Sequence, residues 1–116
     1  MSEYIANFWI CGNPDEITNR LGVLPTSVRL RVPFDYWDYE IRTSENAVTE
    51  MIHFLDSIHM KLASMKQEYA MGITFRVETT DNGADTFHTL EANEIKSLSN
   101  FNLDIAFQTI FKSSGD

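Results

Sequence analysis

The sequence predicts an α+β domain: a mostly antiparallel sheet with one long helix and two short helices packed on one face. Three observations lead to this fold class. Residues 47–69 form a long amphipathic segment, several segments alternate apolar and polar residues, and capping residues mark a short helix near the N-terminus. With 116 residues, the chain is expected to form a single domain, residues 1–116.

The first predicted strand covers residues 4–11, which are rich in aromatic and β-branched side chains. Successive side chains of a strand point to opposite faces of the sheet. Phe8 and Ile10 therefore share one face, and Ile5 and Trp9 share the other. Two apolar faces predict a strand in the centre of the sheet.

A short helix is predicted next, because residues that start and stop helices flank it. Asn13 is placed to cap its N-terminus, Pro14 suits the first helical position, and Glu16 could complete a capping box. Gly22 is expected to end the helix in the left-handed conformation, and Pro25 prevents its continuation.

Two alternating segments, residues 28–32 and 36–42, predict an antiparallel hairpin, because the link between them is short. We expect its apolar face to lie on the long helix and its polar face to meet water. Trp37 and Tyr39 are expected in the core, with Tyr36 facing out. The residues expected to pair across the polar face are Arg29 and Arg31 with Asp38 and Glu40.

The long helix is predicted over residues 47–69, where apolar residues recur at steps of three and four. At ~1.5 Å per residue it would be roughly 35 Å long. We expect the rest of the chain to pack against it. Its apolar stripe comprises Val48, Met51, Leu55, Ile58, Leu62, Met65 and Tyr69.

The C-terminal third is predicted to add three strands and a short helix. Ile95 and Leu98 are expected to be the buried residues of that helix, and Leu103, Ile105 and Phe107 to share one face of the last strand. The predicted elements are a strand at 73–79, a turn at 81–85, a strand at 86–90, a helix at 92–100, a strand at 103–111 and a frayed tail at 112–116.

Composition excludes several classes of function. The net charge of −8 disfavours nucleic-acid binding, which depends on Lys and Arg neutralising phosphates. No apolar run approaches the ~20 residues of a membrane span, and the acidic N-terminal segment does not resemble a secretory signal. The single cysteine cannot form an internal disulfide, so a cytoplasmic location is expected.

The sequence contains no convincing catalytic or metal-binding motif. Glu50, His53, Asp56 and His59 follow one another at intervals of three residues. On an ideal helix Glu50 and His59 would lie about 180° apart, so the four cannot share one metal. Cys11 is interpreted as a structural cysteine, because no base adjoins it in sequence. Only His53, His59 or His88, brought close to it by the fold, could activate it. We predict no enzyme activity and no cofactor.

One stretch resembles a known family. The motif is a strand followed by Pro14-x-x-Ile17-x-x-x-Leu21-Gly22-x-x-Pro25-Thr26. It is similar to the opening of bacterial proteins grouped as domain of unknown function 4279. The similarity continues through Trp37 and Leu55 to Leu103-Asp104-Ile105, nearly the whole chain. The resemblance implies an α+β fold and implies no catalytic activity.

We interpret the chain as a non-enzymatic cytoplasmic protein-binding module, most concretely an immunity protein that neutralises a basic bacterial toxin. The expected binding surface is the polar face of the hairpin, at Asp35, Tyr36, Asp38 and Glu40. The alternative is a housekeeping or regulatory domain that binds a small molecule in a cavity between sheet and helix. A monomer is expected in preference to a homodimer.

Overall fold

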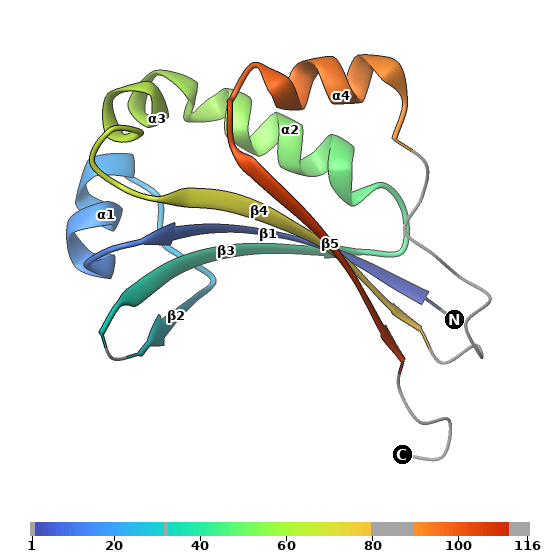
Figure 1. Cartoon of the computed structure of the whole chain (residues 1–116), viewed down its shortest axis with the longest axis horizontal. Coiled ribbons are helices and arrows are strands. Elements are labelled where there is room, and N and C mark those ends of the chain that lie inside the picture. Colours follow the sequence, from blue (N-terminus) through green and yellow to red (C-terminus); the bar gives the residue numbers. More distant parts are fainter. Residues whose placement is uncertain (1, 32, 80–89, 112–116) are drawn as a thin grey trace.

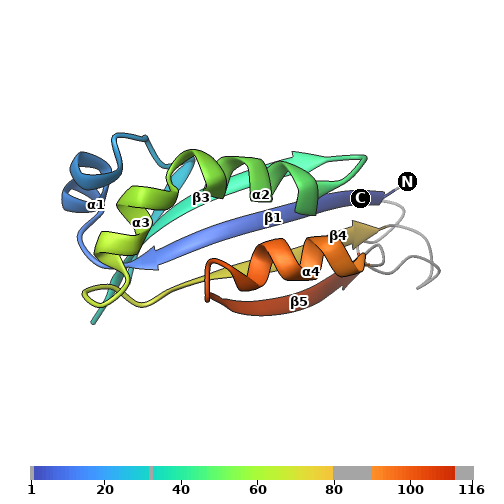
Figure 2. The ribbon, with the colours of Figure 1, turned by 90° about the horizontal axis from the view of Figure 1, so that it is seen from above.

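A five-stranded sheet carries its helices on one face (Figure 1). The computed structural model describes residues 2–31, 33–79 and 90–111. Figure 2 shows α2 and α3 lying over β1 and β3, and α4 lying over β4 and β5. The predicted α+β class is therefore confirmed. The elements are β1 (Ser2–Cys11), α1 (Pro14–Leu21), β2 (Ser27–Leu30), β3 (Asp35–Thr43), α2 (Ala47–Ser57), α3 (His59–Met65), β4 (Met71–Thr79), α4 (Ala92–Ser99) and β5 (Asp104–Phe111).

The strand order is β2-β3-β1-β4-β5. Neighbours among the first four strands are antiparallel, and with α1 and α2 they form a ferredoxin-like split βαβ arrangement. β5 instead runs parallel to β4. Parallel neighbours need a long crossover connection, and α4 lies in that connection. The sheet is therefore mixed. Three of the four pairings among the described strands are antiparallel, as a mostly antiparallel sheet requires, and β5 is the exception.

The prediction of one long helix is wrong, because the helix breaks at Ile58 into α2 and α3. Ile58 has φ −117° and ψ 12°, outside the helical range, and its N–H donates to Leu55 O at 3.2 Å. The Ser57 hydroxyl donates to Phe54 O at 2.5 Å, a side-chain bond that competes with the helix backbone and bends helices. The predicted apolar stripe survives the break, since Leu55 and Leu62 remain buried on either side of it.

β1 lies in the centre of the sheet, as predicted, with β3 on one side and β4 on the other. Phe8 and Ile10 are buried beneath the helices, and Ile5 is buried on the opposite face. Because β1 contributes side chains to both faces, it links the helix-covered core to the exposed side of the sheet.

The ends of α1 follow the predicted capping residues. The Asn13 side chain accepts a hydrogen bond from the Glu16 N–H at 3.0 Å, and Pro14 is the first helical residue. The capping box is only half formed, because the Glu16 carboxylate accepts instead from the Tyr69 hydroxyl at 2.6 Å. Gly22 ends the helix with φ 71°, in the left-handed region.

Gly22→Ala is expected to lower the free energy of unfolding by about 1 kcal/mol, because a Cβ disfavours the left-handed conformation. The added carbon would meet only the flexible end of Lys61, at 3.1 Å, so backbone strain is the main cost. Urea denaturation of both proteins measures the difference. Gly22→Asn is the control, since asparagine tolerates this conformation, and equal losses in both variants would contradict the explanation.

The C-terminal elements agree with the sequence in part. The predicted helix at 92–100 is α4, in which Leu98 is buried as expected. The prediction that Ile95 is buried is wrong: it is 53% exposed, because it lines an open hollow between α4 and β5. The predicted turn at 81–85, the tail at 112–116 and all but Leu90 of the strand at 86–90 lie outside the described residues. Leu90 itself is not in a strand.

Candidate functional site

The face of the sheet opposite the helices, called here the open face, carries mostly polar side chains. Strand register and alternation assign them, since neighbouring residues of a strand point to opposite faces. The open face thus gathers chemically useful groups from all five strands. Its polar and aromatic residues include Glu3, Asn7, Trp9, Arg29, Tyr36, Asp38, Glu40, Arg42, Thr74, Arg76, Glu78 and Gln108.

Trp9 lies across the backbone of the neighbouring strand at Gly72. The two residues are register partners, and a Cβ added to Gly72 would stand 2.6 Å from Cζ2 of the indole. No larger residue at position 72 would leave room for this indole. Tyr36 packs edge-on against Trp9, with ring centroids 6.1 Å apart and an interplanar angle of 72°. Trp9 is therefore a fixed aromatic surface on the open face.

Asp38 holds Arg29 in place beside these rings. The Arg29 guanidinium donates two hydrogen bonds to the Asp38 carboxylate, at 2.7 and 2.9 Å, and Asn7 donates a third at 3.1 Å. Asp38 is only 3% exposed. The hydrogen bonds to Asp38 raise the pKa of Arg29, which stays charged, and its guanidinium carbon lies 4.4 Å from the centre of the Tyr36 ring.

A network of ion pairs occupies the open face beside this cluster. Arg42 contacts Glu40 at 2.9 Å and Glu78 at 3.5 Å, and Arg76 contacts the same two carboxylates at 3.3 and 3.2 Å. Arg42 also pairs with Glu3 at 2.5 Å. Hydrogen bonds to Glu40 and then Glu3 raise the pKa of Arg42. The acidic groups of the open face are thus largely neutralised within the protein.

A shallow pocket of about 320 Å³ lies between the aromatic cluster and the ion-pair network. The Thr74 hydroxyl and the Gln108 amide form no hydrogen bond with any other described residue, so both remain able to bind a partner. The pocket combines an aromatic surface, fixed arginines and unused polar groups. Its lining residues are Asn7, Trp9, Arg29, Tyr36, Thr74, Arg76 and Gln108.

The four residues expected to bind a partner are separated by the fold. Tyr36 lines the pocket, Asp38 lies beneath it and positions Arg29, and Glu40 belongs to the ion-pair network. Asp35 belongs to the helix side of β3, where it alternates with Tyr36. The predicted Arg29–Asp38 pair is confirmed. Arg31 follows the end of β2 and, among the described residues, forms no ion pair.

Sequence reasoning missed the contributions of β1, β4 and β5 to the pocket. Alternation along β1 places Trp9 on the second face of that strand. The strand order that brings Thr74 and Gln108 beside it cannot be predicted from alternation. Gly72 offered a local signal, since glycine inside a strand often marks close approach of another group.

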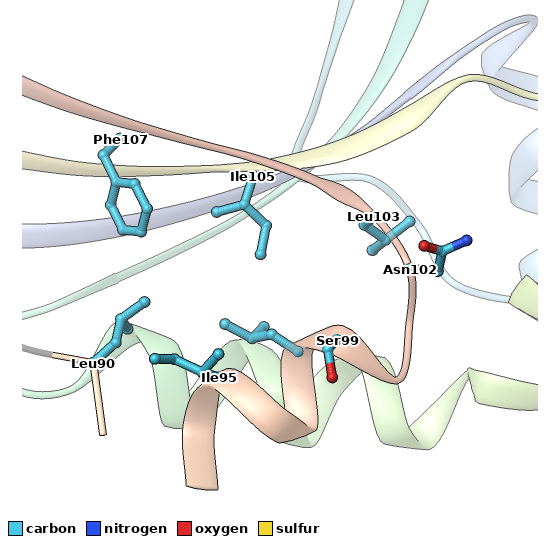
Figure 3. Close-up of a pocket in the computed structure, with 8 residues that line it drawn as sticks. Leu90, Ile95, Ser99, Asn102, Leu103, Ile105 and Phe107 are labelled. Carbon is cyan, nitrogen blue, oxygen red and sulfur yellow. The ribbon is translucent and has the colours of Figure 1, made fainter. Parts of the chain in front are cut away.

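A second hollow lies between α4 and β5 and is called here the α4–β5 groove (Figure 3). Its volume is about 370 Å³, and Ile105 and Phe107 of β5 point toward Leu90 and Ile95 across it. The Ser99 hydroxyl points away and donates to Lys96 O at 2.7 Å. Apart from this hydroxyl and the Asn102 amide, the side chains that line the groove are apolar. Its lining residues are Leu90, Ile95, Leu98, Ser99, Asn102, Leu103, Ile105 and Phe107.

The residues weighed for metal binding or nucleophilic catalysis do not gather in one place. Among the described residues, no three His, Cys, Asp or Glu side chains are grouped so that they could hold a metal ion. His53 and His59 are exposed, and Cys11 is a half-buried free thiol. His88 lies outside the described residues. None of the helices in the described part of the chain has the length and apolar character needed to cross a membrane.

Comparison with known families agrees with the motif around α1. The family model described as Domain of unknown function (DUF4279) matches residues 2–112. The chain belongs to the DUF4279 family. No curated protein and no solved structure matches it. The DUF4279 match spans all five strands, so both the open-face pocket and the α4–β5 groove lie within the family domain.

Proposed function

We propose that the protein is a non-enzymatic binding domain that recognises another protein through its open face. The observation that carries this proposal is the cluster of Trp9, Tyr36 and Arg29. Tryptophan, tyrosine and arginine are the residue types most enriched at the energetic centres of protein interfaces. Here they lie together, surrounded by polar and charged side chains, as the centre and rim of an interface do.

The cluster is held in its geometry before any partner arrives. The indole of Trp9 rests on Gly72, and two hydrogen bonds from Arg29 to Asp38 fix the guanidinium. Side chains that are already ordered lose little conformational entropy on binding. This preorganisation favours a recognition role for the cluster over a purely structural one.

The negative charge of the protein acts at longer range. Most acids of the open face are paired with arginines, whereas Asp15, Glu50 and Asp56 lie on the helix side of the molecule. An overall charge of −8 would attract a basic partner and speed its association, while the side chains of the open-face pocket would determine the contact. The most concrete form of the proposal is a cytoplasmic immunity protein that neutralises a basic bacterial toxin.

A housekeeping or regulatory role in binding a polar small molecule has less support. Ligand pockets usually place a few polar groups where they orient the ligand. In the α4–β5 groove the Ser99 hydroxyl is bonded to its own helix, so among the lining side chains only the Asn102 amide remains to orient a polar compound.

Trp9→Ala and Tyr36→Ala are each expected to weaken partner binding at least tenfold, about 1.4 kcal/mol or more, because each removes part of the aromatic centre. The tagged protein would first capture its partner from lysate of its own organism. Isothermal titration with the purified partner would then give the dissociation constants.

Met60→Ala is the matched control, since Met60 is a large apolar residue that is 82% exposed on α3, on the opposite side of the molecule. It should bind like the wild type. Unchanged affinity in Trp9→Ala and Tyr36→Ala would reject the open face as the recognition surface. If both variants bound the partner more weakly but the partner were not a toxin, the open face would remain the recognition surface and only the immunity role would be rejected.

A further inference from the structure

The two edge strands of the sheet differ in how they are protected. β2 has four residues, one of them Arg29, and Arg31 follows directly. β5 has eight residues, of which only Asp104 is charged. Natural proteins usually guard exposed edges by making them short or charged, because an unguarded edge can pair with a strand of another chain. By this criterion β2 is guarded and, as far as residues 2–31, 33–79 and 90–111 show, β5 is not.

Large apolar side chains are exposed beside the β5 edge. Ile95 is 53% exposed, Phe107 is 55% exposed and Phe111 is 61% exposed, and Ile105 adds to the same surface. Ile95 and Phe107 face each other across the α4–β5 groove (Figure 3). Their exposed parts amount to roughly 400 Å² of apolar surface, taking about 150–250 Å² for each large side chain. Patches of that size on monomers are often functional.

We propose that a second copy of this chain covers the groove by antiparallel pairing of β5 with β5. Two-fold symmetry suits the apolar edge, because the same patch then serves both partners. In the joined sheet both helix layers are taken to lie on the same side. The helix-facing residues of one β5, which are Ile105, Phe107, Thr109 and Phe111, must then lie opposite helix-facing residues of the other. Pairing centred on Phe107 meets this condition and uses the whole strand.

In this register each exposed apolar residue of β5 lies opposite a residue of the partner strand. Phe107 opposes the partner's Phe107, Ile105 opposes the partner's Thr109, and Phe111 opposes the partner's Leu103 beside the groove. The only charged residue of the strand, Asp104, faces the partner's Ile110, so no like charges meet. Two five-stranded sheets become one sheet of ten strands, and the open faces remain free. The apolar patch supplies about half of the ~800 Å² per partner of a standard interface, so the dimer is expected to be weak.

Sedimentation equilibrium of the whole protein tests the proposal over roughly 1–500 µM, where an interface of this size should dissociate. The apparent mass should rise from 13.3 kDa toward twice that value. Ile95→Lys and Phe107→Lys should weaken dimerisation at least tenfold, because each places a charge in the interface. Since Phe107 also stacks on Phe75 at 5.7 Å, Ile95→Lys is the variant that leaves the sheet intact. Met60→Lys is the control, because it adds the same charge at an exposed site on α3. This variant should dimerise like the wild type.

Disulfide trapping tests the register. In a Cys11→Ser background, Phe107→Cys should cross-link to itself on mild oxidation, because facing Cα atoms lie about 4.5–5.5 Å apart in antiparallel pairs. Thr109→Cys should not cross-link. The proposal is overturned if the wild type stays at 13.3 kDa throughout, if Ile95→Lys dimerises normally, or if Thr109→Cys cross-links in place of Phe107→Cys. Native mass spectrometry that finds a monomer carrying a small apolar molecule, lost in Ile95→Lys, would assign the groove to that ligand and overturn it too.

Discussion

Trp37→Ala is expected to lower the free energy of unfolding by about 3–5 kcal/mol, the usual cost of truncating a buried tryptophan. Trp37 is fully buried and is the largest side chain in the core. Its ring packs edge-on against Phe8 at 6.1 Å and parallel to Tyr39 at 6.3 Å. Its indole N–H donates to the Thr18 hydroxyl at 3.1 Å, which ties β3 to α1. The substitution therefore leaves a cavity and removes this link.

Urea denaturation followed by far-UV circular dichroism measures the loss without relying on tryptophan fluorescence. Trp37→Phe keeps most of the ring contacts but loses the hydrogen bond to Thr18, so its loss should be clearly smaller. Leu24→Ala, at an exposed site, should stay within about 0.5 kcal/mol of the wild type. A loss below about 1 kcal/mol in Trp37→Ala would contradict the central place of this residue in the core.

Gly72→Ala is expected to destabilise the fold by about 1–3 kcal/mol, the usual cost of overpacking. The added Cβ would stand 2.6 Å from the Trp9 indole and 2.9 Å from the backbone oxygen of Asp104. The indole can move, but the strand backbone yields less easily. The same change should displace Trp9 and weaken partner binding, because it disturbs the aromatic surface on the open face.

A double-mutant cycle separates the two contacts. Trp9→Ala removes the indole. Gly72→Ala should therefore lower the free energy of unfolding less in the Trp9→Ala background than in the wild type. The loss that persists in that background measures the clash with Asp104 O. Chemical denaturation of the four proteins gives the free energies of unfolding. Simple additivity of the two single losses would show that the indole does not rest on Gly72.

Local features of the fold were predictable because nearby residues determine them. Asn13, Pro14 and Gly22 specify both ends of α1, and alternation along β1 identified it as a central strand with two apolar faces. The hairpin of β2 and β3, with its Arg29–Asp38 pair, followed from a short link between two alternating segments. In each case the signal and the structure lie within about a dozen residues of each other.

The remaining features depend on contacts that periodicity does not encode. The break at Ile58 arises from a hydroxyl bond made by Ser57, while the apolar spacing continues unchanged through it. The parallel β4–β5 pairing was missed because it depends on the crossover through α4. The open-face pocket needs Trp9, Thr74 and Gln108 on neighbouring strands, and only the strand order supplies that. The exposure of Ile95 likewise follows from its place in the α4–β5 groove.

The central position of β1 also has a consequence for biosynthesis. Of the five strands described here, β1 is synthesised first, yet its partner β4 begins only at Met71. At about 5–20 residues per second, β1 waits roughly 3–12 seconds for the residues that cover its second edge. During this interval both apolar faces of the strand are exposed, with Phe8 and Ile10 on one and Ile5 and Trp9 on the other. The nascent chain is therefore most vulnerable to aggregation before β4 has been made, and chaperones would act on it at that stage.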